Sequence, residues 1–164
     1  MIPKYTLLQE VQTKAVYRVL DEIPSPDTND STAVLFVLID MNAENLELRL
    51  EGKARMMEHL ANRSWLAKEE IRDPINMDAL SRAESNIVQR RRHLIDQLLE
   101  HGQKLFVPSY RGRLVRKFVE SGQGSKPFFY RTLRLWWQGG CVASSLVTDF
   151  PKCGRKGERR VQEC

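Results

Sequence analysis

The chain has 164 residues, of which 41% are hydrophobic and 29% charged, and a formal net charge of +5, so it can bury a core and is not wholly disordered. No stretch approaches the roughly 18 consecutive apolar residues that a membrane-spanning helix needs, and the N-terminus lacks the basic and then apolar pattern of a signal peptide. We therefore expect a cytoplasmic protein with no membrane partner.

The first half of the chain predicts a small β-rich domain over residues 1–72. Residues 15–20 and the apolar residues 33–39 have strand composition, and the second run is apolar enough to be buried on both faces of a sheet. The turn formers between them indicate a hairpin with a long exposed loop. Residues 5–8 are expected to add an edge strand, and residues 64–67 a last strand.

After Asp40 the pattern becomes helical, because Leu50, Met56, Met57 and Leu60 can share one face of a helix. Residues 73–79 are interpreted as a linker, since the residue before a proline is pushed away from helical geometry.

Residues 80–150 predict an all-helical domain. Its first helix is expected from Asp78 to His101, with Gly102 as the terminating residue. Three arginines, 90–92, lie mostly off the apolar stripe of this helix, where a solvated surface and phosphate contact are equally consistent. That stripe is expected to contain Ile87, Leu94, Ile95, Leu98 and Leu99.

Two shorter helices follow, separated by a four-residue turn at 121–124. Ser109 is a candidate N-cap for the first, and Ser125 for the second, which should end near Gln138 at a pair of glycines. These are the proportions of a helix-turn-helix, although protein-binding domains also contain basic three-helix units. Residues 151–164 predict a basic C-terminal arm.

The last predicted helix can serve as a recognition helix in a DNA major groove. Phe129, Leu133 and Trp136 have the spacing of its inner face, whereas for Phe128 and Trp137 packing is favoured over DNA contact. The candidate DNA-binding residues are Ser125, Lys126, Phe128, Tyr130, Arg131, Arg134, Arg111, Arg113, Lys152, Arg155, Lys156, Arg159 and Arg160.

Charge distribution supports a polyanionic partner for the second half. Residues 1–79 carry a formal charge of −5, and residues 80–164 carry +10, an asymmetry typical of nucleic-acid binding by the basic part. The three cysteines and three histidines are scattered and lack metal-ligand spacing, so neither a metal site nor a catalytic site is expected.

Residues 130–140, with the sequence Tyr-Arg-Thr-Leu-Arg-Leu-Trp-Trp-Gln-Gly-Gly, resemble the end of the recognition helix in TnsB-type transposases of heteromeric, targeted bacterial transposons. Residues 146–150 and the later Gly-Glu-Arg-Arg at 157–160 match a second element of that family in the same order. Similarity continues more weakly upstream, at residues 16–20, 37–40 and 89–99. Departures from the family pattern occur at Pro127, Phe128, Thr132 and Leu135.

We expect an α+β chain with a small β-rich N-terminal domain and an all-α helix-turn-helix domain. The resemblance implies a DDE-type transposase of the Mu and retroviral-integrase type, whose N-terminal domains bind repeated sites in the transposon ends. In that family a later RNase H-like domain uses three carboxylates and Mg²⁺, so we expect this chain to be a fragment or natural truncation without catalysis and without its own cofactor. Implied partners are double-stranded transposon-end DNA, further transposase subunits and an ATPase regulator, in a nucleoid-associated setting. The alternatives are a free-standing helix-turn-helix transcriptional regulator and a protein-docking module of a transposition complex.

Overall fold

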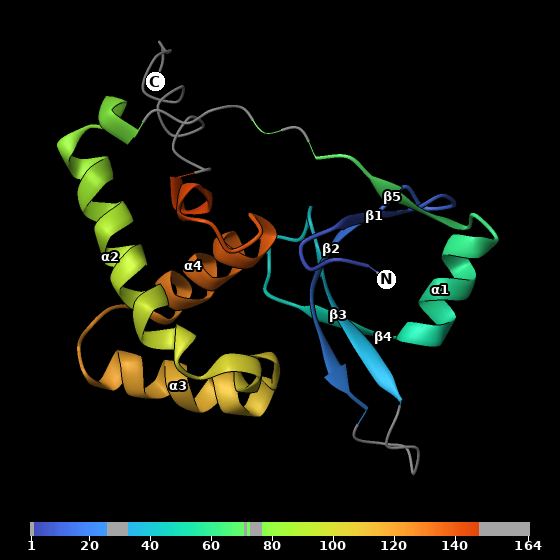
Figure 1. The fold of residues 1–164 in the computed structure, drawn as a ribbon. Helices are drawn as coiled ribbons and strands as arrows, with labels where there is room; N and C mark the ends of the chain where they lie inside the picture. The colour runs from blue at the N-terminus through green and yellow to red at the C-terminus, as the bar shows by residue number, and fades with distance from the viewer. Residues whose placement is uncertain (1, 26–32, 71, 73–76, 148–164) are drawn as a thin grey trace.

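The computed structural model describes residues 2–25, 33–70, 72 and 77–147, and it has the α+β architecture expected from the sequence. Figure 1 shows a sheet with helix α1 on one side of the molecule and helices α2, α3 and α4 on the other. The predicted basic arm and residues 73–76 of the predicted linker lie outside the described residues. No helix among the described residues is long and apolar enough to cross a membrane.

A five-stranded antiparallel sheet with the order β4-β3-β2-β1-β5 forms from the N-terminal part of the chain. The expected strands at 15–20, 33–39 and 64–67 are confirmed. The expected edge position at 5–8 is wrong, because β5 pairs with β1 on the side away from β2. The strands are β1 (Leu7–Glu10), β2 (Val16–Pro24), β3 (Val34–Asp40), β4 (Leu48–Gly52) and β5 (Trp65–Lys68).

Strand β4 corrects the expectation of a helix that includes Leu50. Residues Leu48 to Glu51 alternate apolar and charged side chains, which is the two-residue period of a strand, and they pair with β3. Helix α1 (Lys53–Ala61) begins only after Gly52, and Met56 is its fully buried residue.

Central strand β3 is covered on both faces, as its apolar sequence predicts: Phe36, Val37, Leu38 and Ile39 have no exposed surface. Because successive side chains alternate between the faces of a sheet, these residues belong to two cores. The core beside α1 contains Ile2, Leu8, Val19, Phe36, Leu38, Met56 and Trp65. The core beside the other helices contains Leu20, Val37, Ile39, Leu94, Ile95, Leu98, Leu105, Val115, Phe118, Phe129, Leu133, Trp137 and Leu146.

Helix α2 (Arg82–Leu99) begins later than the expected Asp78, after the 3₁₀ turn η1 (Met77–Ala79). Its start is fixed by a capping box in which the Ser81 hydroxyl accepts from the Glu84 N–H and the Glu84 carboxylate accepts from the Ser81 N–H. The expected apolar stripe is partly wrong, since Leu99 is 54% exposed. Arg91 is buried instead and donates to the Leu146 carbonyl at 2.6 Å.

Helix α3 (Pro108–Glu120) follows the 3₁₀ helix η2 (Gly102–Phe106). Ser109 was expected to cap it, but Val107 holds that position and makes no side-chain cap hydrogen bond. Proline favours the first helical position because its ring fixes φ near the helical value, so the helix starts one residue before the serine could act.

Helix α4 (Lys126–Gln138) confirms the predicted N-cap: the Ser125 hydroxyl accepts from the Phe128 N–H at 3.2 Å. Phe129 and Leu133 are buried as expected, and the burial of Trp137 confirms its interpretation as a packing residue, whereas Trp136, expected on the inner face, is only half-buried. The inner face is rotated and widened because α4 packs against the sheet as well as against α2 and α3.

The C-terminal end of α4 is joined to the sheet by a buried arginine of β2. Arg18 is 1% exposed; its Nε donates to the Gln138 carbonyl at 2.8 Å, and its Nη1 donates to the Tyr5 carbonyl at 2.7 Å. The guanidinium also forms an ion pair with Glu70, while Arg72 donates to the Gly139 carbonyl at 2.6 Å. Two cations therefore meet the negative end of the α4 dipole. The division into domains at 1–72 and 80–150 stays a prediction.

Candidate nucleic-acid interface

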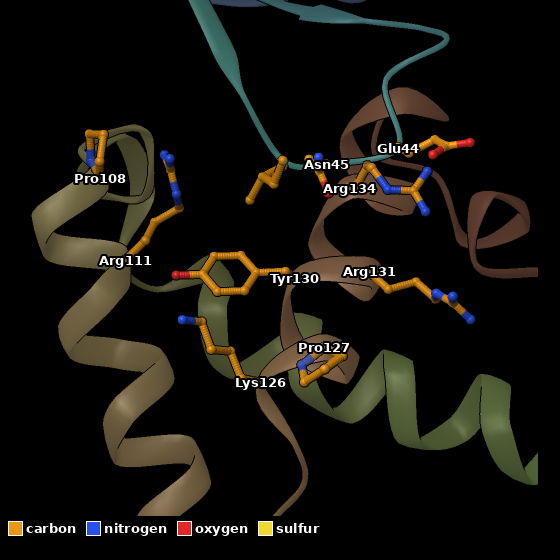
Figure 2. A pocket seen from close by; sticks show the side chains of 10 residues that line it. Glu44, Asn45, Pro108, Arg111, Lys126, Pro127, Tyr130, Arg131 and Arg134 are labelled. Carbon is orange, nitrogen blue, oxygen red and sulfur yellow. The ribbon is translucent and has the colours of Figure 1, made fainter.

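The exposed side of α4 lines an open cleft between α3 and the loop that connects β3 to β4, residues 41–47 (Figure 2). Five α4 residues contribute at helical spacing, which places them on one face of the helix. We call this surface the α4 cleft; its lining residues are Glu44, Asn45, Leu46, Pro108, Arg111, Lys126, Pro127, Tyr130, Arg131 and Arg134.

Positive charge dominates the α4 cleft, since four of its lining residues are lysine or arginine and only Glu44 is acidic. Lys126 and Arg131 are exposed. Figure 2 shows the Tyr130 hydroxyl between the side chains of Arg111 and Lys126, with Arg131 projecting away from Tyr130 toward the opposite edge of the same α4 face. The arrangement presents several cations and a hydroxyl to one ligand surface, as phosphate and base-edge recognition requires.

Arg111 differs from the other cations of the cleft because it is 6% exposed and donates from Nη1 to the Leu105 carbonyl at 2.9 Å. Burial lowers the pKa of this guanidinium, yet an arginine stays charged at neutral pH. Its carbonyl contact holds η2 beside α3, so Arg111 contributes to the wall of the cleft rather than to its exposed surface.

The structure does not bring the other candidate residues into this cleft. Arg113 is exposed on α3, with its guanidinium 5.4 Å from the Tyr110 ring, and Ser125 is exposed at the start of α4. Phe128 lines a different cleft, beside α2. The candidates Lys152, Arg155, Lys156, Arg159 and Arg160 lie outside the described residues.

Phe128 packs between two other side chains, as its interpretation as a packing residue predicts. The Phe118 ring is stacked on it at a centroid distance of 6.2 Å with a 10° interplanar angle. On α2, the Arg90 guanidinium lies 4.7 Å from its ring centroid, a cation–π contact. This pair joins the start of α4 to α2.

Sequence reasoning missed the contribution of the β3–β4 loop to the cleft. Glu44, Asn45 and Leu46 come from the acidic half of the chain and have no basic or aromatic neighbours that would mark a binding segment. They reach α4 because Gln138, the last helical residue, donates from Nε2 to the Asp40 carbonyl at 2.9 Å and the Ala43 carbonyl at 3.0 Å. No local pattern predicts such a contact.

Within the described residues, no group of three or more His, Cys, Asp and Glu side chains has the arrangement of a metal site. Cys141 is a half-buried free thiol, and burial raises its pKa, so it is protonated at neutral pH. This side chain therefore has the properties of a packing residue.

The helices that form the α4 cleft match a known family. The TnsB second domain matches residues 88–150, a range that includes most of α2 and all of α3 and α4. The resemblance to the N-terminal region of TnsB-type transposases is therefore confirmed.

The chain is also similar in sequence to a particular protein over a short stretch. The chain is 36% identical over 55 residues to the transposon Tn7 transposition protein TnsB of Escherichia coli. That stretch is 34% of this chain and 8% of the relative, so the chain matches only a small part of the relative's length.

Proposed function

We propose that this chain binds transposon-end DNA as part of a DDE-type transposase, with α3 and α4 acting as a helix-turn-helix and α4 as its recognition helix. The observation that carries this proposal is that α4 has a buried apolar side and an exposed basic side. Its inner side is anchored by Phe129, Leu133 and Trp137, while Lys126 and Arg131 are exposed on the other side. The family relation supports a role in transposition.

The dimensions of the α3–α4 unit agree with this function. A major groove about 12 Å wide admits one α-helix, and the 13 residues of α4 give a length suited to crossing it. In this arrangement Arg131 contacts base edges, while Lys126 and Tyr130 contact the flanking phosphates. Arg134 lies about one turn beyond Tyr130 along the helix and donates to the Gln138 side-chain carbonyl at 3.0 Å.

Helix α3 supplies a second feature suited to phosphate. Val107 gives no side-chain cap, and Pro108 at the first helical position lines the α4 cleft. The N–H groups of the next residues are therefore not satisfied by a capping side chain, and helix N-termini favour anions. We propose that Arg113, which is exposed on α3, contacts the phosphate backbone of the duplex.

We propose that the transposase of which this chain is a part supplies catalysis and assembly through other domains and subunits. Strand cleavage and joining would belong to an RNase H-like domain that binds Mg²⁺, and assembly would involve further subunits and an ATPase regulator. The basic residues at 152–160 would follow the phosphate backbone as a C-terminal arm.

A binding-site selection from a random duplex library, using the 164-residue chain, tests the proposal. Arg131→Ala should weaken binding to the selected duplex by about 1–3 kcal/mol and change binding to random duplex little. Lys126→Ala should weaken both duplexes and reduce the dependence of log K on log salt by about one.

Arg92→Ala is the matched control, because Arg92 is exposed on α2 and does not line the α4 cleft. This variant should preserve the ratio of the affinities for the two duplexes, because loss of a positive charge outside the α4 cleft weakens both alike. If Arg131→Ala and Arg92→Ala bind the selected duplex equally well, α4 is not the recognition helix.

A further inference from the structure

The β3–β4 loop places one carboxylate in an otherwise cationic cleft. Glu44 and Asn45 are exposed, and they line the α4 cleft together with Arg131 and Arg134. In Figure 2 the Glu44 side chain lies beside Arg134, at the edge of the surface that α4 presents. Any duplex that contacts this face of α4 must therefore approach the Glu44 carboxylate.

The position of the loop is set by hydrogen bonds that do not involve the Glu44 side chain. Gln138 donates to the carbonyls of Asp40 and Ala43 at 2.9 and 3.0 Å. The Asp40 carboxylate accepts from the Asn42 N–H at 2.8 Å, and the Glu47 N–H donates to the Asn45 carbonyl at 3.1 Å. Since backbone groups and other side chains hold the loop, replacement of Glu44 should leave its course unchanged.

A fixed carboxylate at this place acts against nonspecific binding. Affinity for random DNA depends mainly on pairing of cations with phosphates, and a negative charge beside Arg134 weakens that pairing wherever a phosphate lies near it. Removal of the carboxylate changes the ratio of the two affinities only if the base contacts of α4 hold the correct sequence where its phosphates lie farther from Glu44 than those of a randomly docked duplex, and this is what the inference requires. A repulsive group that disfavours the wrong partners is a common source of specificity.

We propose that Glu44 is a specificity-determining residue of the DNA interface: its carboxylate repels phosphates, so that a duplex is held firmly only where α4 makes its base contacts. This inference rests on the proposed function of α4. It assigns to the acidic N-terminal part of the chain a role in discrimination between DNA sequences.

Glu44→Gln tests the inference, and Glu47→Gln is its matched control. Both substitutions keep the side-chain shape and raise the net charge by one, and both glutamates are exposed in the same loop, but Glu47 does not line the α4 cleft. Comparison of the two therefore separates a local effect in the cleft from the general effect of net charge. The probes are the duplex selected from a random library and a random-sequence duplex of equal length.

Glu44→Gln should raise affinity for the random duplex about fivefold, the order expected when one charge is removed close to phosphates in a hydrated interface. It should raise affinity for the selected duplex less, so the ratio of the two affinities should fall about threefold or more. Glu47→Gln should change that ratio by less than twofold. Equal ratios for the two variants would overturn the inference.

Failure of this inference can be distinguished from failure of the proposed function. If Arg131→Ala removes preference for the selected duplex while the two glutamine variants behave alike, α4 reads DNA and Glu44 has no part in discrimination. If Arg131→Ala has no effect, the assignment of α4 fails and the inference fails with it. Circular dichroism and thermal melting of each variant confirm that the fold is retained.

Discussion

Replacement of Arg18 by methionine tests how the sheet holds the end of α4. The Arg18 side chain is 1% exposed, and its guanidinium donates to the carbonyls of Gln138 and Tyr5 and pairs with the Glu70 carboxylate. Methionine retains most of the length and the apolar stem but removes the charge and every donor. Two part-buried carbonyls then lose their donor, and the Glu70 carboxylate keeps only Arg72 as an ionic partner.

The expected loss of stability is about 3 kcal/mol. Removal of one member of a buried ion pair costs about 3–5 kcal/mol, and an unsatisfied buried carbonyl costs about 1–3 kcal/mol. The lower end applies here because the Glu70 side chain is 29% exposed, so water can solvate its carboxylate once the arginine is absent. A domain of this size has a total stability of about 5–15 kcal/mol, so the variant should fold with a clearly reduced margin.

Urea unfolding followed by tryptophan fluorescence measures this loss. The transition midpoint of Arg18→Met should fall while the slope m stays constant. Arg92→Met is the control, because Arg92 is exposed on α2 and should alter stability by less than about 0.5 kcal/mol. If the two variants unfold within about 0.5 kcal/mol of each other, the buried guanidinium contributes no net stability and the reasoning is wrong.

Three further predictions concern the same junction. Hydrogen bonding from Arg18 lowers the pKa of Glu70 below its ordinary value of 4.5. The stabilising contribution of the Glu70 carboxylate is therefore present above pH 4.5 and is lost as pH falls through the folded-state pKa. The difference in stability between the unmodified chain and Glu70→Gln should shrink below pH 4.5, and a constant difference would contradict this. Gly139→Ala should lower the melting temperature strongly, because its Cβ would lie 1.9 Å from a neighbouring side-chain carbon, whereas Gly112→Ala in α3 meets no heavy atom within 4 Å and should raise it slightly. Gln138→Met removes two donations to loop carbonyls and should cost about 1–2 kcal/mol; hydrogen exchange of the amides at 41–47 should accelerate, and unchanged exchange would show that the loop is held in another way.

Local patterns predicted the elements whose structure depends on neighbouring residues. The apolar run of β3 indicated a strand covered on both faces, and Ser125 marked the start of α4. These predictions succeed because strand burial and helix capping are determined within a few residues. The error at β4 has the same origin: Leu50 fits a helical stripe with Met56 as well as it fits a two-residue alternation, and the pairing with β3 decides between them.

Long-range contacts explain what could not be predicted in the candidate site. The assignment of Trp136 as the inner tryptophan treated α4 as a helix packed on other helices alone, but the sheet covers a further part of its surface and buries Trp137. Glu44 reaches the cleft from a segment more than 80 residues earlier in the chain. Its presence follows from the contacts of Gln138 with loop carbonyls, which no periodicity in the sequence reports.

The amide of Gln138, which joins the β3–β4 loop to the last residue of α4, has a thermodynamic consequence for association. A loop that had to be immobilised on complex formation would cost entropy for its backbone and about 0.5–1.5 kcal/mol for each rotamer-rich side chain fixed. Here those hydrogen bonds exist before any ligand arrives. The surface is thus preorganised, and the heat-capacity change of DNA binding should reflect the area of contact without a contribution from folding of this segment.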